Sequence, residues 1–562
     1  MATLVSISKL LFLNISFLVL VCVFIVIYSQ SSEHPITRNR SVFIGGVQHP
    51  DCKIFHSLDD YKAKCLYLKS NDSCVSQGYI DYLYLFYCRL GRFPLLGHIL
   101  LFLWLLLLFY LLANTASEYF CPSLENLSKL LKLSPTIAGV TLLSLGNGAN
   151  DVFASLVSFE GSGTSGIGFN TILGGVFFVS CVVVGVLSIS VRHREVRVRK
   201  SDFVRDVCFL LLVLLCLLMI LITGEINLFG AMGFTLIYVV YVFVVWVSST
   251  RWKGDTERDA NDLNVPLLGD IEGGDTEFGL KIKKKPCCVR SSLCLKLLRV
   301  LEMPLYLPRR LTIPVVCEER WSKPCAISSV TLAPLLLFAL WIPYKGNGSQ
   351  NTSLIVYGTG LLIGMILGVT AFFTTKSSRP PKKYLFPWLV GGFIMSVTWS
   401  YISAQELVGL LVSLGYICGI SPSILGLTVL AWGNSIGDMI TNLTMALNGG
   451  TEGAQVAISG CYAGPIFNTL VGLGLSLVCS TWSQYPSSIV IPTDPYLLET
   501  LAFLVVGLLW ALAVLIRRDM RLEGTLGGGL LVIYFISLLL RLIQTLGSFQ
   551  LHDMLLVLLF KG

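Results

Sequence analysis

Charged residues are scarce in this 562-residue sequence: 13% of the chain is Asp, Glu, Lys or Arg, whereas 54% is hydrophobic. This composition excludes a soluble globular protein, which needs a largely polar surface. Many stretches exceed the roughly 20 apolar residues that cross a bilayer, so we predict an all-α polytopic membrane protein. The net charge of +8 does not indicate nucleic-acid binding, because the basic residues occur in short clusters between apolar stretches.

Two kinds of signal are also missing. The acidic, Gly-rich stretch at residues 254–279 lacks the D-x-[DN]-x-[DN]-G-x5-E spacing, which excludes an EF-hand calcium loop. No KDEL-type retrieval signal is present. The plasma membrane, the vacuolar membrane and other endomembranes therefore all remain compatible with the sequence, which also leaves the oligomeric state open.

The apolar stretches predict about thirteen transmembrane helices. They lie at residues 7–29, 92–116, 135–158, 166–190, 203–223, 226–248, 325–343, 354–374, 386–406, 421–446, 455–480, 497–516 and 525–546. Four Lys/Arg clusters then fall on one side of the membrane, which the positive-inside rule makes cytosolic. These clusters lie at residues 192–200, 281–285, 376–383 and 517–521.

This pattern divides the chain into seven segments. They are a signal peptide or signal-anchor helix at 1–29, a lumenal or extracellular Cys-containing segment at 30–91, a first five-helix repeat at 92–249, a cytosolic linker loop at 250–324, two additional transmembrane helices at 325–374, a second five-helix repeat at 386–546 and a C-terminal tail at 547–562. The choice between a cleaved signal and an anchor stays open. We interpret the basic part of the linker as a solvated tether; the alternative is an amphipathic segment on membrane lipid, acylated at Cys287 and Cys288.

The segment at 30–91 has the features of a lumenal or extracellular region. Its even number of cysteines predicts two disulfides, with three possible pairings of Cys52, Cys65, Cys74 and Cys88. Sequons on the same predicted side of the membrane indicate a glycoprotein. The acceptors are Asn39, Asn71, Asn347 and Asn351.

One motif occurs twice in the sequence. The stretch SPTIAGVTLLSLGNGANDVFASL at 134–156 returns as SPSILGLTVLAWGNSIGDMITNL at 421–443, which aligns Asp151 with Asp438 at an offset of 287 residues. A second echo follows each copy: FNTILGG from Phe169 and FNTLVGLG from Phe467. A carboxylate at bilayer depth costs roughly 2.5 to 3.5 kcal/mol, so two placed in register indicate a function for both.

The two copies lie in repeats of opposite orientation. The five helices between residues 92 and 248 correspond in order to the five between 386 and 546, and the predicted topology sends one motif helix outward and the other inward. We therefore predict an inverted-repeat antiporter core of 5+5 helices. Inverted repeats with Gly-interrupted helices are a construction of secondary transporters.

The repeated motif offers oxygen ligands to a cation. Helical spacing places Ser144, Asn147, Gly148 and Asp151 on one face, and Asn434 with Asp438 on the matching face. The faces contain no His or Cys, so they favour hard cations such as Ca²⁺, Na⁺ and K⁺ over zinc or copper. The two carboxylates balance one Ca²⁺ or two monovalent ions without selecting between them.

Flanking residues extend this predicted site. Asn170 and Asn468 come from the FNT triplets. Glycines such as Gly148 and Gly437 let the helices loosen, so that the backbone carbonyls of Thr141 and Thr428 can turn toward the ion. We assign Ser155 to helix packing, and leave Thr441 and Asn442 open between packing and ligation.

The paired motifs GNGAND and GNSIGD, each followed by an FNT-containing helix, resemble the alpha-1 and alpha-2 repeats of the calcium/cation antiporter superfamily. Within this superfamily, Asp at the acidic position is similar to the cation/calcium exchanger branch, and the Cys-bearing segment is similar to that of its plant members. The resemblance extends over residues 50 to 545. The resemblance implies a ten-helix antiporter core and no cofactor beyond the transported ions. It also implies cation coordination by Asn147, Asp151, Asn170, Asn434, Ser435, Asp438 and Asn468.

The first motif departs from that branch at one position. The branch usually reads GNGAPD, whereas this chain has Asn150 in place of the proline. Proline would kink the helix and free carbonyls for the ion. We hypothesise that Asn150 permits transport with altered ion selectivity.

The leading interpretation is a secondary active antiporter, not an enzyme, that moves Ca²⁺, Na⁺ and/or K⁺, with proton coupling available at the aspartates. One alternative is an intramembrane aspartyl protease that uses Asp151 and Asp438. Neither motif matches the G-x-G-D sequence that is typical of such proteases. A passive cation channel is a further alternative, which the inverted repeat disfavours.

Overall fold

The computed structural model describes the chain with several gaps. The described residues are 60–70, 78–91, 93–123, 144–160, 165–194, 196–256, 306–316, 321–341, 350–375, 380–381, 385–448, 450–491 and 495–560. Several predictions fall outside them. These concern the first hydrophobic stretch at 7–29, Asn39, Cys52, Asn71, Cys74, Thr141, Cys287, Cys288 and Asn347.

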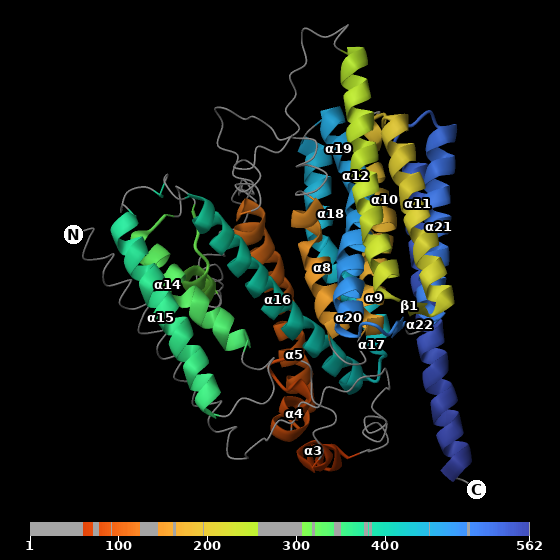
Figure 1. Cartoon of the computed structure of the whole chain (residues 1–562). Helices are drawn as coiled ribbons and strands as arrows, with labels where there is room; N and C mark the ends of the chain where they lie inside the picture. Colours follow the sequence, from red (N-terminus) through yellow and green to blue (C-terminus); the bar gives the residue numbers. More distant parts are fainter. Residues whose placement is uncertain are drawn as a thin grey trace, which may run out of the picture. The chain divides into compact units, whose positions relative to one another are not determined.

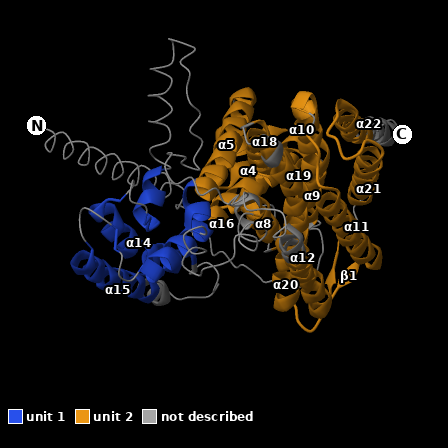
Figure 2. Cartoon of the chain, turned by 90° about the horizontal axis from the view of Figure 1, so that it is seen from above, with its two compact units in different colours: residues 1–43, 118–130, 271–399 blue, residues 44–117, 131–270, 400–562 orange. Residues whose placement is uncertain are grey.

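The chain forms two compact units (Figure 2). Unit 1 comprises residues 1–43, 118–130 and 271–399, and unit 2 comprises 44–117, 131–270 and 400–562. Two long helical stretches belong to both units. They are α5 (Pro94–Thr115) with its π-helical extension η3 (Ala116–Phe120), and α16 (Leu385–Cys418).

Unit 2 holds both copies of the motif in a bundle of helices (Figure 1). After α5, the first repeat consists of α8 (Ser144–Glu160), the α9–η5–α10 stretch (Ser165–Phe177, Phe178–Val183, Val184–Val191), the 3-10 turn η6 (Arg192–Arg194), α11 (Lys200–Thr223) and α12 (Leu228–Thr256). After α16, the second consists of α17 (Pro422–Leu425), η9 (Gly426–Leu430), α18 (Ala431–Asn448), the α19–η10–α20 stretch (Gly450–Phe467, Asn468–Leu473, Gly474–Ser483), α21 (Pro495–Arg517) and α22 (Gly524–Phe560).

Ten described helices are long and apolar enough to cross a membrane, so the chain is a multi-pass membrane protein. The predicted count of thirteen is not confirmed. Residues 7–29 lie outside the described part, and the two motif helices are not among the ten. The described part of α8 has 17 residues, and α18 is interrupted by polar residues such as Asn434 and Asp438. The polar residues of the motif thus weaken the apolar signal of the helices that carry it.

Backbone pairing between linkers shows that the repeats are inverted. At one end of unit 2, strand β1 (Glu225–Ile226), which joins helices four and five of the first repeat, pairs antiparallel with β2 (Ile489–Val490), which joins helices three and four of the second. At another linker pair the roles are exchanged: Arg197, between helices three and four of the first repeat, bridges Arg521, between helices four and five of the second. Equivalent linkers therefore lie at opposite ends. The same pairing brings the basic clusters at 192–200 and 517–521 to one end, as predicted.

Helix packing follows the same exchange. Helix α10 of the first repeat packs on α22 of the second, and α20 of the second packs on α12 of the first. The pairs α11 with α19 and α21 with α9 are related in the same way. The third helices form the centre: 83% of the most apolar window of residues 166–194 is buried, against 28% for residues 228–248. The site residues of the FNT triplets therefore lie in the core of the bundle.

The start of the second motif has a local cause. The Ser421 side chain accepts a hydrogen bond from the Ile424 N–H and so caps the helix, and Pro422 occupies the first helical position. Both residue types are favoured there, because serine satisfies an open N–H group and proline has none to satisfy. The following π-helical segment η9 contains Thr428, so the helix widens before Asn434.

Unit 1 contains the two additional helices, α14 (Lys323–Trp341) and α15 (Gln350–Thr374), packed against each other. Gly364 and Gly368 of α15 lie against Thr331 of α14, where a side chain would clash. The end of the predicted linker, at residues 306–316, is packed into this unit. Arg309 is fully buried there with its guanidinium over the Tyr119 ring.

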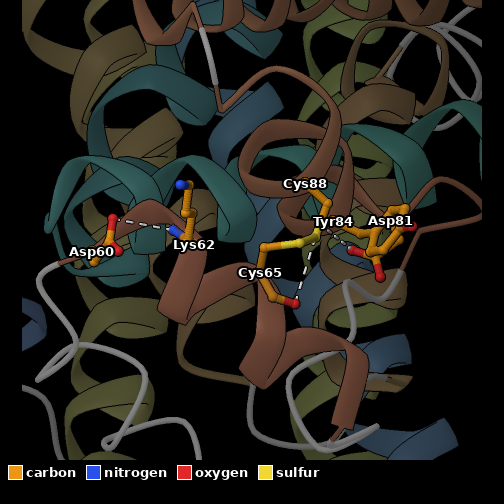
Figure 3. Close-up of a disulfide and its surroundings, with 6 residues drawn as sticks. All are labelled: Asp60, Lys62, Cys65, Asp81, Tyr84 and Cys88. Carbon is orange, nitrogen blue, oxygen red and sulfur yellow. Dashed lines mark hydrogen bonds between the residues drawn. A yellow bond between two sulfur atoms is a disulfide. The ribbon is translucent and has the colours of Figure 1, made fainter.

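The segment before α5 forms a small helical cap on unit 2. We use "the cap" for residues 60–70 and 78–91, which contain α3 (Tyr61–Ser70), α4 (Tyr82–Tyr84) and the π-helical turn η2 (Leu85–Arg89). A disulfide between Cys65 and Cys88 joins α3 to η2 (Figure 3). Of the three possible pairings of the four cysteines, only the one that contains this disulfide agrees with the structure.

Candidate cation-binding site

Asp151 lies at the centre of the site, buried with 3% of its surface exposed. Its Oδ1 accepts a hydrogen bond of 3.0 Å from the Asn434 Nδ2 of α18. Its Oδ2 accepts one of 2.7 Å from the Asn468 Nδ2 at the start of η10. The first repeat therefore supplies the carboxylate, and the second supplies both amides that hold it.

Three buried oxygen atoms beside this carboxylate have no hydrogen-bond partner among the described residues. They are the Oδ1 of Asn434, the Oδ1 of Asn468 and the Oγ of Ser435. An unsatisfied buried acceptor costs about 1–3 kcal/mol, so such atoms gather rarely without a function. Together with the carboxylate they form the oxygen-rich donor set that hard cations prefer.

Asp438, the predicted counterpart of Asp151, has a different environment. It is only partly buried, and within the described part of the chain its carboxylate accepts no hydrogen bond. It lies close enough to Asp151 for their charges to interact. The structure therefore brings the two aspartates together but gives amide donors to only one of them.

The FNT asparagines also differ. Asn468 reaches across to Asp151, whereas the Nδ2 of Asn170 donates to the Gly166 carbonyl of its own helix at 2.8 Å. Both side chains are buried. Of the predicted asparagine ligands, Asn434 and Asn468 thus contact Asp151, and Asn170 is directed along its own helix.

The remaining predicted residues are placed as follows. Asn147 lies on α8 and Ser144 is buried at its start. The Thr428 hydroxyl donates to the Ile424 carbonyl at 2.7 Å, and its carbonyl accepts from the Ala431 N–H, so both groups are used within their own helix. A Cβ at Gly437 would meet open space.

Ser155 agrees with the packing role that the sequence assigns to it, because its hydroxyl contacts the Ser476 hydroxyl of α20 at 3.0 Å. Asn442 is buried, and a Cβ at Gly460 would lie 3.1 Å from its Oδ1. It therefore contacts the neighbouring helix α19, whereas Thr441 is only partly buried.

Two residues of the site are not singled out by the sequence. A Cβ at Gly175 of α9 would lie 3.4 Å from both Asp151 Oδ2 and Ser435 Oγ, so this glycine forms a wall of the site. Phe109 of α5 lies against Gly433, which precedes Asn434. Gly175 is part of the FNTILGG echo, but Phe109 carries no such signal, because it lies in an unbroken apolar run.

A family model described as "Sodium/calcium exchanger protein" matches residues 101–247 and 388–543, which cover both repeats. The chain belongs to the sodium/calcium exchanger protein family. The exchanger is similar to cation/calcium exchanger 2 of Arabidopsis thaliana, with 54% identity over 96% of this chain and 98% of that protein. It is 32% identical to the mitochondrial sodium/calcium exchanger protein of Rattus norvegicus, over 89% and 91% of the two chains.

Among solved structures, the exchanger is similar to an H⁺/Ca²⁺ exchanger, with 11% identity, a TM-score of 0.40 and coverage of 77% of this chain and 78% of that one. Membership of an exchanger family confirms the predicted antiporter. The protease and the passive channel are therefore set aside.

Proposed function

We propose that this exchanger moves Ca²⁺ in exchange for Na⁺ or K⁺, by alternating access to one site between the repeats, with protons as a further coupling ion. The names of the relatives support Ca²⁺ and Na⁺ as ions. The observation that carries the proposal is the buried Asp151 carboxylate, held by amides of the opposite repeat. Beside it lie three oxygens that have no hydrogen-bond partner in the part of the chain that the structure describes. A hard cation is the ligand that such a set fits.

The charge of the site sets what it can carry. Asp151 and Asp438 together supply two negative charges, which one Ca²⁺ or two monovalent ions neutralise. An uncompensated charge is costly at bilayer depth. The exchanger with an empty site therefore switches between its two conformations less readily than the exchanger with an occupied site. Transport in one direction then requires an ion or a proton to be carried in the other direction.

The amides provide a way to hold the carboxylate in the absence of an ion. Asn434 and Asn468 turn their N–H groups to Asp151 and their oxygens elsewhere. A carboxamide rotated about its terminal bond exchanges its N–H group for its oxygen. We infer that cation binding rotates one or both amides, so that carboxylate and amide oxygens face the ion together.

A flux assay tests this proposal. The full-length protein in proteoliposomes is given opposed gradients of Ca²⁺, Na⁺, K⁺ and protons, one pair at a time. The expected result is Ca²⁺ movement that requires a counter-ion on the opposite side and stops in Asp151→Asn. Flux without a counter-ion, or unchanged flux in that variant, contradicts the proposal. Ser155→Ala, which alters a hydroxyl used in packing, is the matched control.

A further inference from the structure

A third carboxylate is buried in unit 2, away from the ion site. Glu406 lies on α16 with 7% of its surface exposed. A carboxylate in a membrane helix needs compensation, because its desolvation is costly. Within the described part of the chain, the hydrogen-bond partners of this carboxylate come from the cap, more than 320 residues earlier in the sequence.

Several hydrogen-bond donors of the cap bind this carboxylate. The Tyr82 hydroxyl donates to Glu406 Oε2 at 2.5 Å. The backbone N–H groups of Tyr79 and Ile80 also donate to the carboxylate. A Cβ at Gly78 would lie 3.1 Å from Oε2, so a glycine lets the backbone come this close. Hydrogen bonds to a charged group are roughly twice as strong as hydrogen bonds between neutral groups. This contact therefore joins the cap specifically to α16.

The same tyrosine joins this contact to the first repeat. Trp104 of α5 donates its indole Nε1–H to the Tyr82 hydroxyl at 2.9 Å. One hydroxyl therefore links α5 to α16, which are the first helices of the two repeats. Leu83 and Phe86 are buried beside it, and the Phe86 ring lies against Gly97 of α5. The inner part of the cap is thus a plug of buried side chains, not an exposed loop.

The plug lies close to the ion site along α5. Trp104 marks its inner end, and Phe109 lies five residues further on, which is about 8 Å at the rise of an α-helix. The Phe109 ring packs on Gly433, next to Asn434, whose amide holds Asp151. Only about 8 Å along α5 therefore separates the plug from the level of the ion site.

We propose that the cap is a gate over the ion site and that Glu406 is its latch. The proposal rests on the antiporter function proposed above. When Tyr82 releases Glu406, α5 and α16 are no longer joined at this end, and cations reach the site from the cap side. The Cys65–Cys88 disulfide joins α3 to η2 (Figure 3). The centres of the Tyr61 ring of α3 and the Tyr87 ring of η2 lie 5.6 Å apart, so the gate moves as one piece.

The first test measures opening without measuring transport. A membrane-impermeant phosphine is added on the cap side of full-length protein in membranes, and the rate at which Cys65 and Cys88 become available for alkylation is followed by mass spectrometry of their peptides. Tyr82→Phe removes the latching hydroxyl, and we expect it to accelerate this reaction about tenfold. Tyr84→Phe is the matched control, because within the described residues the Tyr84 hydroxyl makes no hydrogen bond.

The second test measures the side on which transport changes. If the open gate is a minor state, populating it strengthens apparent binding from that side in proportion. In Tyr82→Phe and in Glu406→Gln, we expect the half-saturating cation concentration to fall about tenfold at the cap face and to stay equal or rise at the opposite face. A merely structural defect lowers the amount of active protein and leaves both half-saturating concentrations unchanged.

Failure of this proposal is distinct from failure of the antiporter function. If Tyr82→Phe matches Tyr84→Phe in the alkylation rate, there is no latch, whatever the flux results. If alkylation accelerates but both faces keep their half-saturating concentrations, the cap opens without gating and the proposal is overturned. Loss of the antiporter function would appear instead as unchanged flux in Asp151→Asn.

Discussion

The two copies of the motif are nearly equivalent in sequence and unequal in structure. Asp151 is buried and held by two amides, whereas Asp438, 287 residues later, is only partly buried and receives no hydrogen bond within the described residues. Inverted symmetry of the backbone alone predicts matching environments. The difference must therefore come from individual residues at which the copies diverge.

We infer that one such divergence contributes to the asymmetry. Gly148 in the first copy aligns with Ser435 in the second, at the same 287-residue offset. Asn468 packs directly on Gly148, where a Cβ would lie 1.9 Å from its Oδ1, and so reaches Asp151. Ser435, which aligns with Gly148, has a side chain where the first copy has none, and the Nδ2 of Asn170 donates to the Gly166 carbonyl of its own helix.

This comparison separates two roles within one site. Asp151 is held by two neutral donors, and we propose that it is the permanent anionic centre of the site. Asp438 is more exposed and accepts no hydrogen bond within the described residues, and we propose that it is the carboxylate that an ion or a proton meets first. On this proposal the glycine at position 148 determines which of the two carboxylates becomes the centre.

The largest expected effect comes from removing the fixed charge. Asp151→Asn leaves an amide where two N–H donors converge, so one donor faces another donor and the ion loses its central ligand. We expect cation exchange to fall by at least a hundredfold. In Asp438→Asn no existing hydrogen bond is lost, and we expect a smaller fall, with a change in the number of counter-ions per Ca²⁺. Isotope flux and reversal potentials in proteoliposomes measure both, and equal losses with the same stoichiometry would contradict the division of roles.

The next effect tests the glycine directly. Gly148→Ser makes the first copy resemble the second, and its Cβ cannot coexist with the present position of Asn468. Loss of a hydrogen bond to a charged group is worth about 1.5–3 kcal/mol, so we expect exchange to fall ten- to a hundredfold. Gly528→Ala on α22, where a Cβ meets open space, is the control and keeps full activity. Normal flux in Gly148→Ser would show that the close approach is dispensable.

A smaller contrast is expected between the two FNT asparagines. Asn468→Ala removes the 2.7 Å bond to Asp151, and we expect about a tenfold loss of exchange. Asn170→Ala removes a bond to the carbonyl of its own helix, and we expect less than a threefold loss. The half-saturating Ca²⁺ concentration of each variant, at matched expression, gives the comparison. If both variants lose activity equally, the two asparagines contribute equally to the site, which contradicts the difference between their hydrogen bonds.

The sequence predicts the parts of this site better than their arrangement. The 287-residue register identifies Asp151, Asp438 and Asn434, because an acidic residue in an apolar run is conspicuous, and the separate FNT echo identifies Asn468. It does not reveal that Asn170 is directed away, since that depends on packing between helices far apart in the chain. Two helix ends were predicted wrongly: α16 continues to Cys418 instead of ending at 406, and α22 continues to Phe560 through most of the predicted tail at 547–562. Apolar runs show where helices lie, but they do not show which polar residue of one helix meets which donor of another, so the contacts of Glu406 were missed.

The smallest expected effect concerns Asn150, the residue that breaks the family pattern beside Asp151. The helix α8 continues through Asn150 without a break. The buried Oδ1 of Asn150 has no hydrogen-bond partner among the residues that the structure describes. In Asn150→Pro the missing N–H and the ring would free a carbonyl one turn earlier, which changes the donors near Asp151 but not the carboxylate itself. We expect exchange to persist and the ratio of Na⁺ to K⁺ as counter-ion to shift a few-fold. Asn150→Ala separates the two causes, because it removes the amide without kinking the helix. Identical ion ratios in all three proteins would contradict the hypothesis that Asn150 alters ion selectivity.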